Sequence, residues 1–117
     1  MSDITLAAVQ AALDATALQQ RVAASNLANL ETPGYLARRV RFADTLRAAL
    51  AAAYRGEVSP AELLARTEAS VIPDLTPPGP NGNNVQIERE LTQLSEAGLR
   101  YEALVRLIRR KFQMLGT

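Results

Sequence analysis

The sequence contains no cysteine, histidine or tryptophan, and two of these absences exclude kinds of chemistry. Without cysteine the chain can form neither a disulfide nor a thiolate centre. Without histidine it lacks the commonest general base and the commonest metal ligand of proteins. Its twelve acidic residues show no spacing typical of a metal site or a catalytic carboxylate pair, and no glycine-rich phosphate loop occurs. We therefore expect no catalytic residue, no cofactor and no metal, and a protein that is not an enzyme.

Strong net charge and long apolar runs are absent too. The formal net charge is +1, so no strong field favours nucleic acid as a partner. No apolar run is long enough to cross a bilayer, so we expect no direct membrane insertion. No Lys or Arg precedes Arg21, whereas a secretory signal peptide begins with positive charge. These features predict a chain that stays in the cytosol or is exported without a cleaved signal.

Alanine and leucine dominate what remains. Hydrophobic residues make up 48% of the chain but aromatic residues only 4%, which suits close helix–helix contacts better than a thick core. The length of 117 residues predicts one domain, residues 1–117. Residues 3–30 contain no Gly or Pro and predict an N-terminal helix. This helix carries two apolar stripes: Leu6, Val9, Leu13, Ala17, Ala24 and Leu27 form the first, and Ile4, Ala11, Ala15, Leu18 and Val22 form the second.

The middle region, residues 31–84, predicts short elements and a loop. Pro33-Gly34 suits the centre of a type II turn. Residues 36–42 are plausibly extended, residues 42–54 predict a helix, and Ser59-Pro60 predicts the start of another, short helix. Residues 73–84 contain four Pro and two Gly and predict a loop, with Asn83 or Asn84 as the N-cap of the next helix.

Residues 84–115 predict a long C-terminal helix with a heptad pattern on one side. Apolar or small residues recur alternately four and three positions apart, which keeps one side of a slightly under-wound helix against a partner. We call this row the seam: Ile87, Leu91, Leu94, Gly98, Tyr101, Val105, Ile108, Phe112 and Leu115. Gly98 would allow close approach of two helices, although glycine also weakens a helix.

A second stripe lies opposite the seam, formed by Leu99, Ala103, Leu107 and Met114. Because both terminal helices carry two stripes, we favour a subunit that packs within itself on one side and against neighbours on the other. The alternative is that these are ordinary scattered surface residues. The basic residues Arg106 to Lys111 are better explained as a solvated face that complements the helix dipole than as a phosphate or lipid site. The fold class is therefore mainly α, with long N- and C-terminal helices pairing as an antiparallel, coiled-coil-like core domain around a partly irregular middle.

Two stretches resemble a known family. Residues 24–35, Ala-Ser-Asn-Leu-Ala-Asn-Leu-Glu-Thr-Pro-Gly-Tyr, resemble the N-terminal signature of bacterial flagellar rod and hook proteins. Residues 81–85 and 88–91 are similar to the start of the C-terminal helix in the rod branch of that family, and residues 99–105 and 111–115 are similar to its later part. The resemblance covers about half of the chain. Asn81 and Leu36 depart from the residues usual at those positions.

The resemblance implies a structural subunit of the proximal rod in the flagellar basal body, which transmits torque and supports rod growth. It implies partners among other copies of itself, other flagellar rod proteins, the MS ring and its FliE adaptor, and the flagellar export apparatus. It also implies a periplasmic location, reached by type III export without signal cleavage. The alternatives are another flagellar rod subunit, or a soluble helical adaptor or export chaperone.

The same resemblance marks six residues for assembly: Asn26, Asn29, Thr32, Pro33, Gly34 and Tyr35. Asn26 and Asn29 can hydrogen-bond to backbone or to neighbouring subunits near the helix end, where carbonyls lack partners. Pro33-Gly34 would fix the chain reversal, and Tyr35 could anchor that turn on a neighbour. For each residue alone, an ordinary helix stop explains the pattern equally well.

Overall fold

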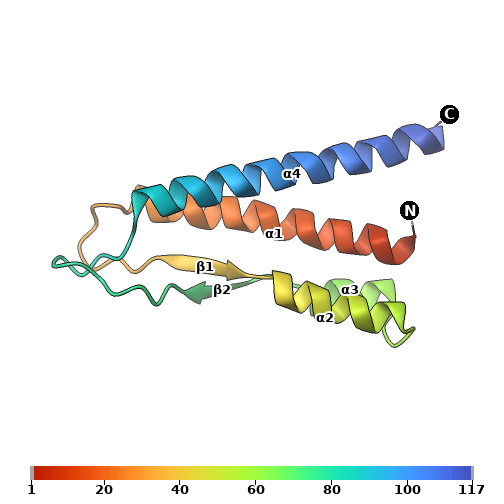
Figure 1. Cartoon of the computed structure of the whole chain (residues 1–117), viewed down its shortest axis with the longest axis horizontal. Helices are drawn as coiled ribbons and strands as arrows, with labels where there is room; N and C mark the ends of the chain where they lie inside the picture. The colour runs from red at the N-terminus through yellow and green to blue at the C-terminus, as the bar shows by residue number, and fades with distance from the viewer. Residues whose placement is uncertain (1, 117) are drawn as a thin grey trace.

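The computed structural model describes residues 2–116, and the side chains of residues 44, 115 and 116 lie outside the description. The N-terminal helix lies in the middle, with the C-terminal helix along one side and the remaining elements along the other (Figure 1). The elements are α1 (Asp3–Ala28), β1 (Arg38–Arg41), α2 (Ala43–Tyr54), α3 (Pro60–Arg66), β2 (Ser70–Pro73) and α4 (Ile87–Gly116). The predicted mainly α fold with paired terminal helices is confirmed.

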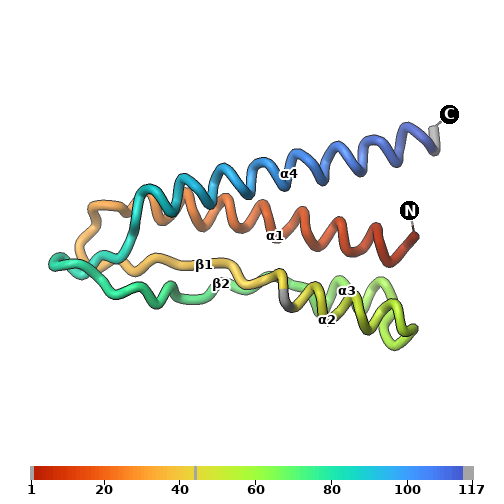
Figure 2. The backbone as a smooth tube through the Cα atoms, viewed as in Figure 1, coloured from red at the N-terminus to blue at the C-terminus, as the bar shows by residue number. Residues whose placement is uncertain are grey.

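The two long helices run antiparallel. Figure 2 shows the two ends of the chain at one end of the molecule and the loops between the layers at the other. We call the looped end, where residues 24–35 meet residues 81–90, the motif junction. The molecule measures 56 × 32 × 15 Å, and its radius of gyration of 17.0 Å exceeds the roughly 13 Å of a compact chain of this length. The fold is therefore long and flat, and it leaves much apolar surface uncovered.

The helix ends follow from local chemistry. Ser2 caps α1, because its Oγ accepts a hydrogen bond from the backbone N–H of Thr5 at 3.1 Å. Ser59 caps α3 in the same way through the N–H of Glu62, with Pro60 in the first turn, as predicted. α1 ends two residues before the predicted position. The Asn29 side chain donates to the Ser25 carbonyl at 2.9 Å and so takes the acceptor that a further helical turn would use.

The prediction that Asn83 or Asn84 caps the C-terminal helix is wrong. α4 begins at Ile87, and both asparagine side chains bind other partners. The extended segment predicted over residues 36–42 appears as β1, which pairs antiparallel with β2 in the register Arg38↔Pro73 to Arg41↔Ser70. β2 was not predicted, because its four residues show no apolar alternation; all four are exposed in the structure.

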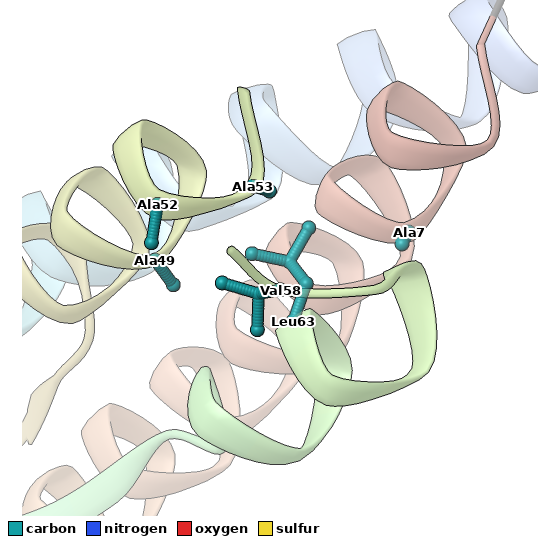
Figure 3. Close-up of a cluster of buried hydrophobic side chains, with 6 residues drawn as sticks. All are labelled: Ala7, Ala49, Ala52, Ala53, Val58 and Leu63. Carbon is teal, nitrogen blue, oxygen red and sulfur yellow. The ribbon is translucent and has the colours of Figure 1, made fainter. Parts of the chain in front are cut away.

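The apolar core lies at the end of the molecule opposite the junction. Leu63 fills a cluster with Ala7, Ala49, Ala52, Ala53 and Val58, contributed by α1, α2, α3 and the α2–α3 loop (Figure 3). Ile4 and Ala8 pack against it. The expectation that one stripe of the N-terminal helix faces neighbouring subunits therefore needs correction. α2 and α3 of the same chain cover part of that second stripe, whereas α4 packs chiefly on α1.

Candidate functional site

The motif junction joins the two stretches of unusual sequence, and Asn26 lies at its centre. Asn26 is completely buried near the end of α1. Its Nδ2 donates to the Arg38 carbonyl at 2.9 Å and to Glu90 Oε2 at 3.0 Å, and its Oδ1 accepts from the Arg38 N–H at 3.1 Å. One amide group thus links α1, β1 and α4. The predicted hydrogen bond to neighbouring backbone is present, and it lies within the subunit.

Glu90 and Arg39 form a buried ion pair beside Asn26. Glu90 is completely buried in the first turn of α4, and its Oε1 lies 2.6 Å from Arg39 Nη2. The same nitrogen lies 2.9 Å from Asp74 Oδ2, and Arg89 Nη1 approaches that oxygen at 3.3 Å. Two carboxylates therefore face two guanidinium groups, so the local charge is balanced. Arg39, Asp74 and Glu90 are largely shielded from water, whereas the Arg89 side chain is 45% exposed.

Asp74 has a perturbed acidity. Burial raises the pKa of its carboxyl, but hydrogen bonds from the Thr76 side chain (2.6 Å) and backbone (2.8 Å), with the charges of Arg39 and Arg89, outweigh this. The net effect holds the pKa below its ordinary value of 3.8. Ionised Asp74 therefore stabilises the folded chain.

We expect stability to fall in acid partly because of Asp74. A group whose pKa is lower in the folded chain contributes its full stabilisation above its unfolded pKa, near 4, and loses it as the pH falls through the folded value. Urea unfolding between pH 6 and pH 2 should show a smaller loss in Asp74→Asn than in the unaltered chain, although Asp74→Asn is less stable at pH 6. Equal losses in both proteins would contradict this role.

Asn83 donates hydrogen bonds to the backbone carbonyls that follow α1. Its Nδ2 lies 2.8, 3.1 and 2.8 Å from the carbonyl oxygens of Asn29, Leu30 and Thr32. These acceptors lie in the turns just past the helix end, where backbone groups lack intrahelical partners. Asn83 therefore acts on the C-terminus of α1 rather than on the N-terminus of α4.

Asn84 holds the other side of the loop. Its Oδ1 accepts from the buried N–H of Ala37 at 2.6 Å, and its Nδ2 donates to the carbonyls of Asp74 and Thr76 at 3.2 and 3.0 Å. The two adjacent asparagines thus connect the segments that follow α1, precede β1 and follow β2.

The predicted turn is present at Pro33-Gly34. The Tyr35 N–H donates to the Thr32 carbonyl at 3.2 Å, and Gly34 has a φ of 75°, as the third position of a type II turn requires. The Thr32 hydroxyl donates to Asn29 Oδ1 at 3.1 Å. Tyr35 turns inward, because its hydroxyl lies 3.4 Å from both Ser25 Oγ and Asn26 Oδ1. All six motif residues therefore lie together at the junction, with Pro33 and Gly34 exposed.

The seam is only partly covered by α1. Leu94, Gly98, Val105 and Ile108 are half-buried, and a Cβ at Gly98 would lie 3.4 Å from Gln20 Nε2, in contact with α1. Four seam residues stay substantially exposed: Ile87 (42%), Leu91 (51%), Tyr101 (39%) and Phe112 (63%). The side chain of Leu115 lies outside the described residues. The face of α4 buried on α1 centres instead on Glu90 and Ala97, which are 0% and 1% exposed.

The junction is held by hydrogen bonds and ion pairs within the chain. Arg39 Nη2, Asp74 Oδ2 and Glu90 Oε1 are buried and meet in ion pairs, whereas the buried Arg39 Nε has no hydrogen-bond partner among the described residues. Among residues 2–116 no group of three or more potential ligands could hold a metal ion. In that range, no helix is long and apolar enough to span a membrane. Glu90 and Arg39 were not singled out in the sequence analysis. A signal was present in the resemblance of residues 88–91, which includes Glu90.

Comparisons with known proteins match both motifs. Residues 6–35 match the family described as "Flagella basal body rod protein". The chain is 31% identical over 124 residues to the flagellar basal body rod protein FlgB of Bacillus subtilis, covering 97% of this chain and 91% of that protein. It is 35% identical to FlgB of Escherichia coli over 115 residues, covering 86% and 81%, and 32% identical to FlgB of Salmonella typhimurium over a similar share.

Proposed function

Since the chain belongs to the FlgB family of flagellar basal body rod proteins, we propose that it forms the proximal rod by polymerising through its terminal helices. It is a structural subunit of the basal body rod, as its relatives are. That family is a structural family and not a family of enzymes. In the proposal, residues 1–117 act as one rod domain that transmits torque and supports rod growth.

The proposal also names partners and a route. The chain leaves the cell through the flagellar export apparatus without signal cleavage and assembles in the periplasm on the MS ring and its FliE adaptor, next to other rod proteins. The observation that supports polymerisation is the uncovered side of α4. Ile87, Leu91, Tyr101 and Phe112 lie on one flank of a helix whose opposite flank has its own apolar residues. One neighbouring helix, α1, is too narrow to cover an apolar arc of this width.

Surface area supports the same reading. The accessible surface is 7469 Å², whereas a compact monomer of this mass exposes roughly 6,200 Å². The exposed large apolar residues of α4 are Ile87, Leu91, Tyr101 and Phe112 in the seam, and Leu99, Leu107 and Met114 on the opposite side. Rows of exposed apolar residues of this kind are typical of interaction sites in soluble proteins. An adaptor that is stable as a monomer would be expected to expose less apolar surface.

Leu91→Asp tests the seam. Leu91 is 51% exposed, so the change should leave the subunit folded while placing a charge in the subunit contact. In a strain that carries only the variant, we expect loss of swimming in soft agar and absence of rods from purified basal bodies. Leu94→Asp should do the same, but Leu94 is half-buried, so that change also disturbs the subunit itself.

Thr92→Asp is the matched control for Leu91→Asp. Thr92 is the adjacent exposed residue, gains the same charge, and points about 100° away around the helix. Cells that carry only the Thr92→Asp variant should swim normally. Normal swimming of Leu91→Asp cells that contain the variant at ordinary levels would contradict the seam as an assembly surface.

A further inference from the structure

Asn81 differs from the other asparagines of the chain in both sequence and exposure. Of the five asparagines, only Asn81 is followed by glycine. Asn81 is also exposed, whereas the other four are buried or half-buried. The Nδ2 atom of each of those four donates at least one hydrogen bond within the chain. Among residues 2–116, Asn81 Nδ2 has no hydrogen-bond partner, so nothing in the described chain holds this nitrogen in place.

An asparagine followed by glycine can lose ammonia without an enzyme. The backbone nitrogen of Gly82 attacks the side-chain carbonyl carbon, Cγ, of Asn81 and forms a C–N bond, while the Cγ–Nδ2 bond breaks. The proton of the attacking N–H goes to the leaving nitrogen, which departs as ammonia and leaves a five-membered imide. Water then opens the imide at either carbonyl and gives aspartate or isoaspartate. Asparagine is among the thermolabile residues, and glycine has no Cβ to shield the attacking nitrogen.

The closed motif junction holds both reacting groups in other hydrogen bonds. The Gly82 N–H donates to the Gly79 carbonyl at 2.9 Å, and Asn81 Oδ1 accepts from the Asn83 N–H at 3.2 Å. The Asn81 carbonyl also accepts from the Gly34 N–H at 2.9 Å. Because the attacking nitrogen must lose its hydrogen and turn toward Cγ, the Gly82 bond has to break before the ring closes. The turn that contains Asn81 therefore slows the reaction while it stays docked.

We propose that Asn81 is a site of spontaneous deamidation, restrained while the motif junction is closed and reactive when it opens. This inference concerns the chemical lifetime of the subunit and does not depend on the proposed polymerisation. Aspartate keeps the length of the main chain and the oxygen that accepts from the Asn83 N–H. Isoaspartate adds one carbon to the main chain before Gly82, which already lies so close to Gly34 that a Cβ on it would be 3.2 Å from Gly34 Cα. Isoaspartate therefore displaces Asn83 from the carbonyls that it binds.

Peptide mapping tests the proposal. The purified full-length chain is incubated in mildly alkaline buffer, with and without guanidinium chloride, and is then digested with trypsin. Cleavage after Arg66 and Arg89 gives the peptide 67–89, which holds three of the asparagines. Mass spectrometry locates the converted residue, and chromatography separates the aspartate and isoaspartate forms. In denaturant we expect Asn81 to convert first, and without denaturant at least about tenfold more slowly, because only transiently opened molecules react.

Asn83→Ala separates the effect of the junction from that of the local sequence. It removes the Nδ2 bonds to the three carbonyls that follow α1 and leaves Asn81 and Gly82 unchanged. In denaturant it should convert at the rate of the unaltered chain, and without denaturant several-fold faster than that chain. Glu102→Ala, far from the junction, should leave the rate unchanged under both conditions.

Two results of the mapping would overturn the proposal. Equal rates for the unaltered chain with and without denaturant would show that the junction gives no protection. Conversion of Asn83 or Asn84 before Asn81 in denaturant would show that the site is wrong. Both comparisons use the unaltered chain, so they hold even if Asn83→Ala fails to fold.

Unfolding in urea distinguishes the two products. Asn81→Asp carries the aspartate form from the start and should unfold at nearly the same urea concentration as the unaltered chain. The unaltered chain, converted in denaturant and refolded, should unfold at a lower concentration that falls as its isoaspartate content rises. Asn81→Gln treated in the same way should keep its midpoint, because its longer side chain does not close a five-membered ring. An unchanged midpoint in the converted chain would overturn the effect assigned to isoaspartate.

Discussion

Replacing Glu90 with alanine is expected to lower the free energy of unfolding by about 3 kcal/mol, at the lower end of the 3–5 kcal/mol found when one partner of a buried ion pair is removed. The change takes a carboxylate from Arg39 and an acceptor from Asn26, at a position that is 0% exposed. The value should stay at the lower end because Asp74 still lies 2.9 Å from Arg39. Urea unfolding at one fixed protein concentration, followed by far-UV circular dichroism, measures it.

Glu102→Ala is the matched control for Glu90→Ala. Glu102, like Glu90, pairs with an arginine. Its partner is Arg106 of the same helix, at 3.1 Å, and both side chains are more than half exposed. Pairs of this kind contribute about 0–1 kcal/mol. Glu90→Gln, which keeps the acceptor for Asn26 and removes only the charge, should fall between the two. If Glu90→Ala and Glu102→Ala cost the same, the buried network does not hold the layers together.

Leu63→Ala is expected to cost about 2–5 kcal/mol, because it removes the largest side chain of the apolar core and leaves a cavity. Leu63 is 0% exposed, and the buried neighbours around it are mostly alanines, whose short side chains cannot extend into the space (Figure 3). Leu75→Ala, at a residue that is 90% exposed, should change stability by less than about 0.5 kcal/mol under the same conditions.

Hydrogen exchange would locate the damage in Leu63→Ala. The backbone amides of α2 and α3 should exchange faster, while those of the motif junction at the other end of the molecule keep their protection. Uniform acceleration along the whole chain would show that the two ends unfold as one unit.

The sequence predicted the elements with local signals, including the extended segment that becomes β1, but not its partner strand β2 or the partners of Asn83. Ser59-Pro60 and Pro33-Gly34 determine their own conformations through capping and a fixed turn type, and both appear as expected. β2 could not be predicted because it forms only by pairing with β1, some thirty residues earlier. The N-cap prediction for Asn83 failed for a related reason: three carbonyls more than fifty residues away are available to its side chain.

The site was predicted in part. The six motif residues do lie together, but the network also requires Glu90 and Arg39, whose partners are set by tertiary structure. The seam was identified by periodicity, yet periodicity cannot tell which helix covers it. The structure covers Leu94 and Ile108 in part and leaves Leu91 and Phe112 uncovered. That the uncovered side meets another subunit remains a prediction.

The antiparallel pairing of α1 with α4 also constrains when the subunit can fold. The hydrogen bond between Asn26 and Glu90 joins residues 64 positions apart, and the rest of the α1–α4 contact joins residues still farther apart, such as Gln20 and Gly98. A polypeptide that emerges with its N-terminus first cannot form that bond until residue 90 has appeared. Until then α1 lacks its main partner, and long-range contacts of this kind also form slowly. Because Glu90 and the rest of α4 come late in the sequence, α1 and α4 cannot pair until most of the polypeptide is free.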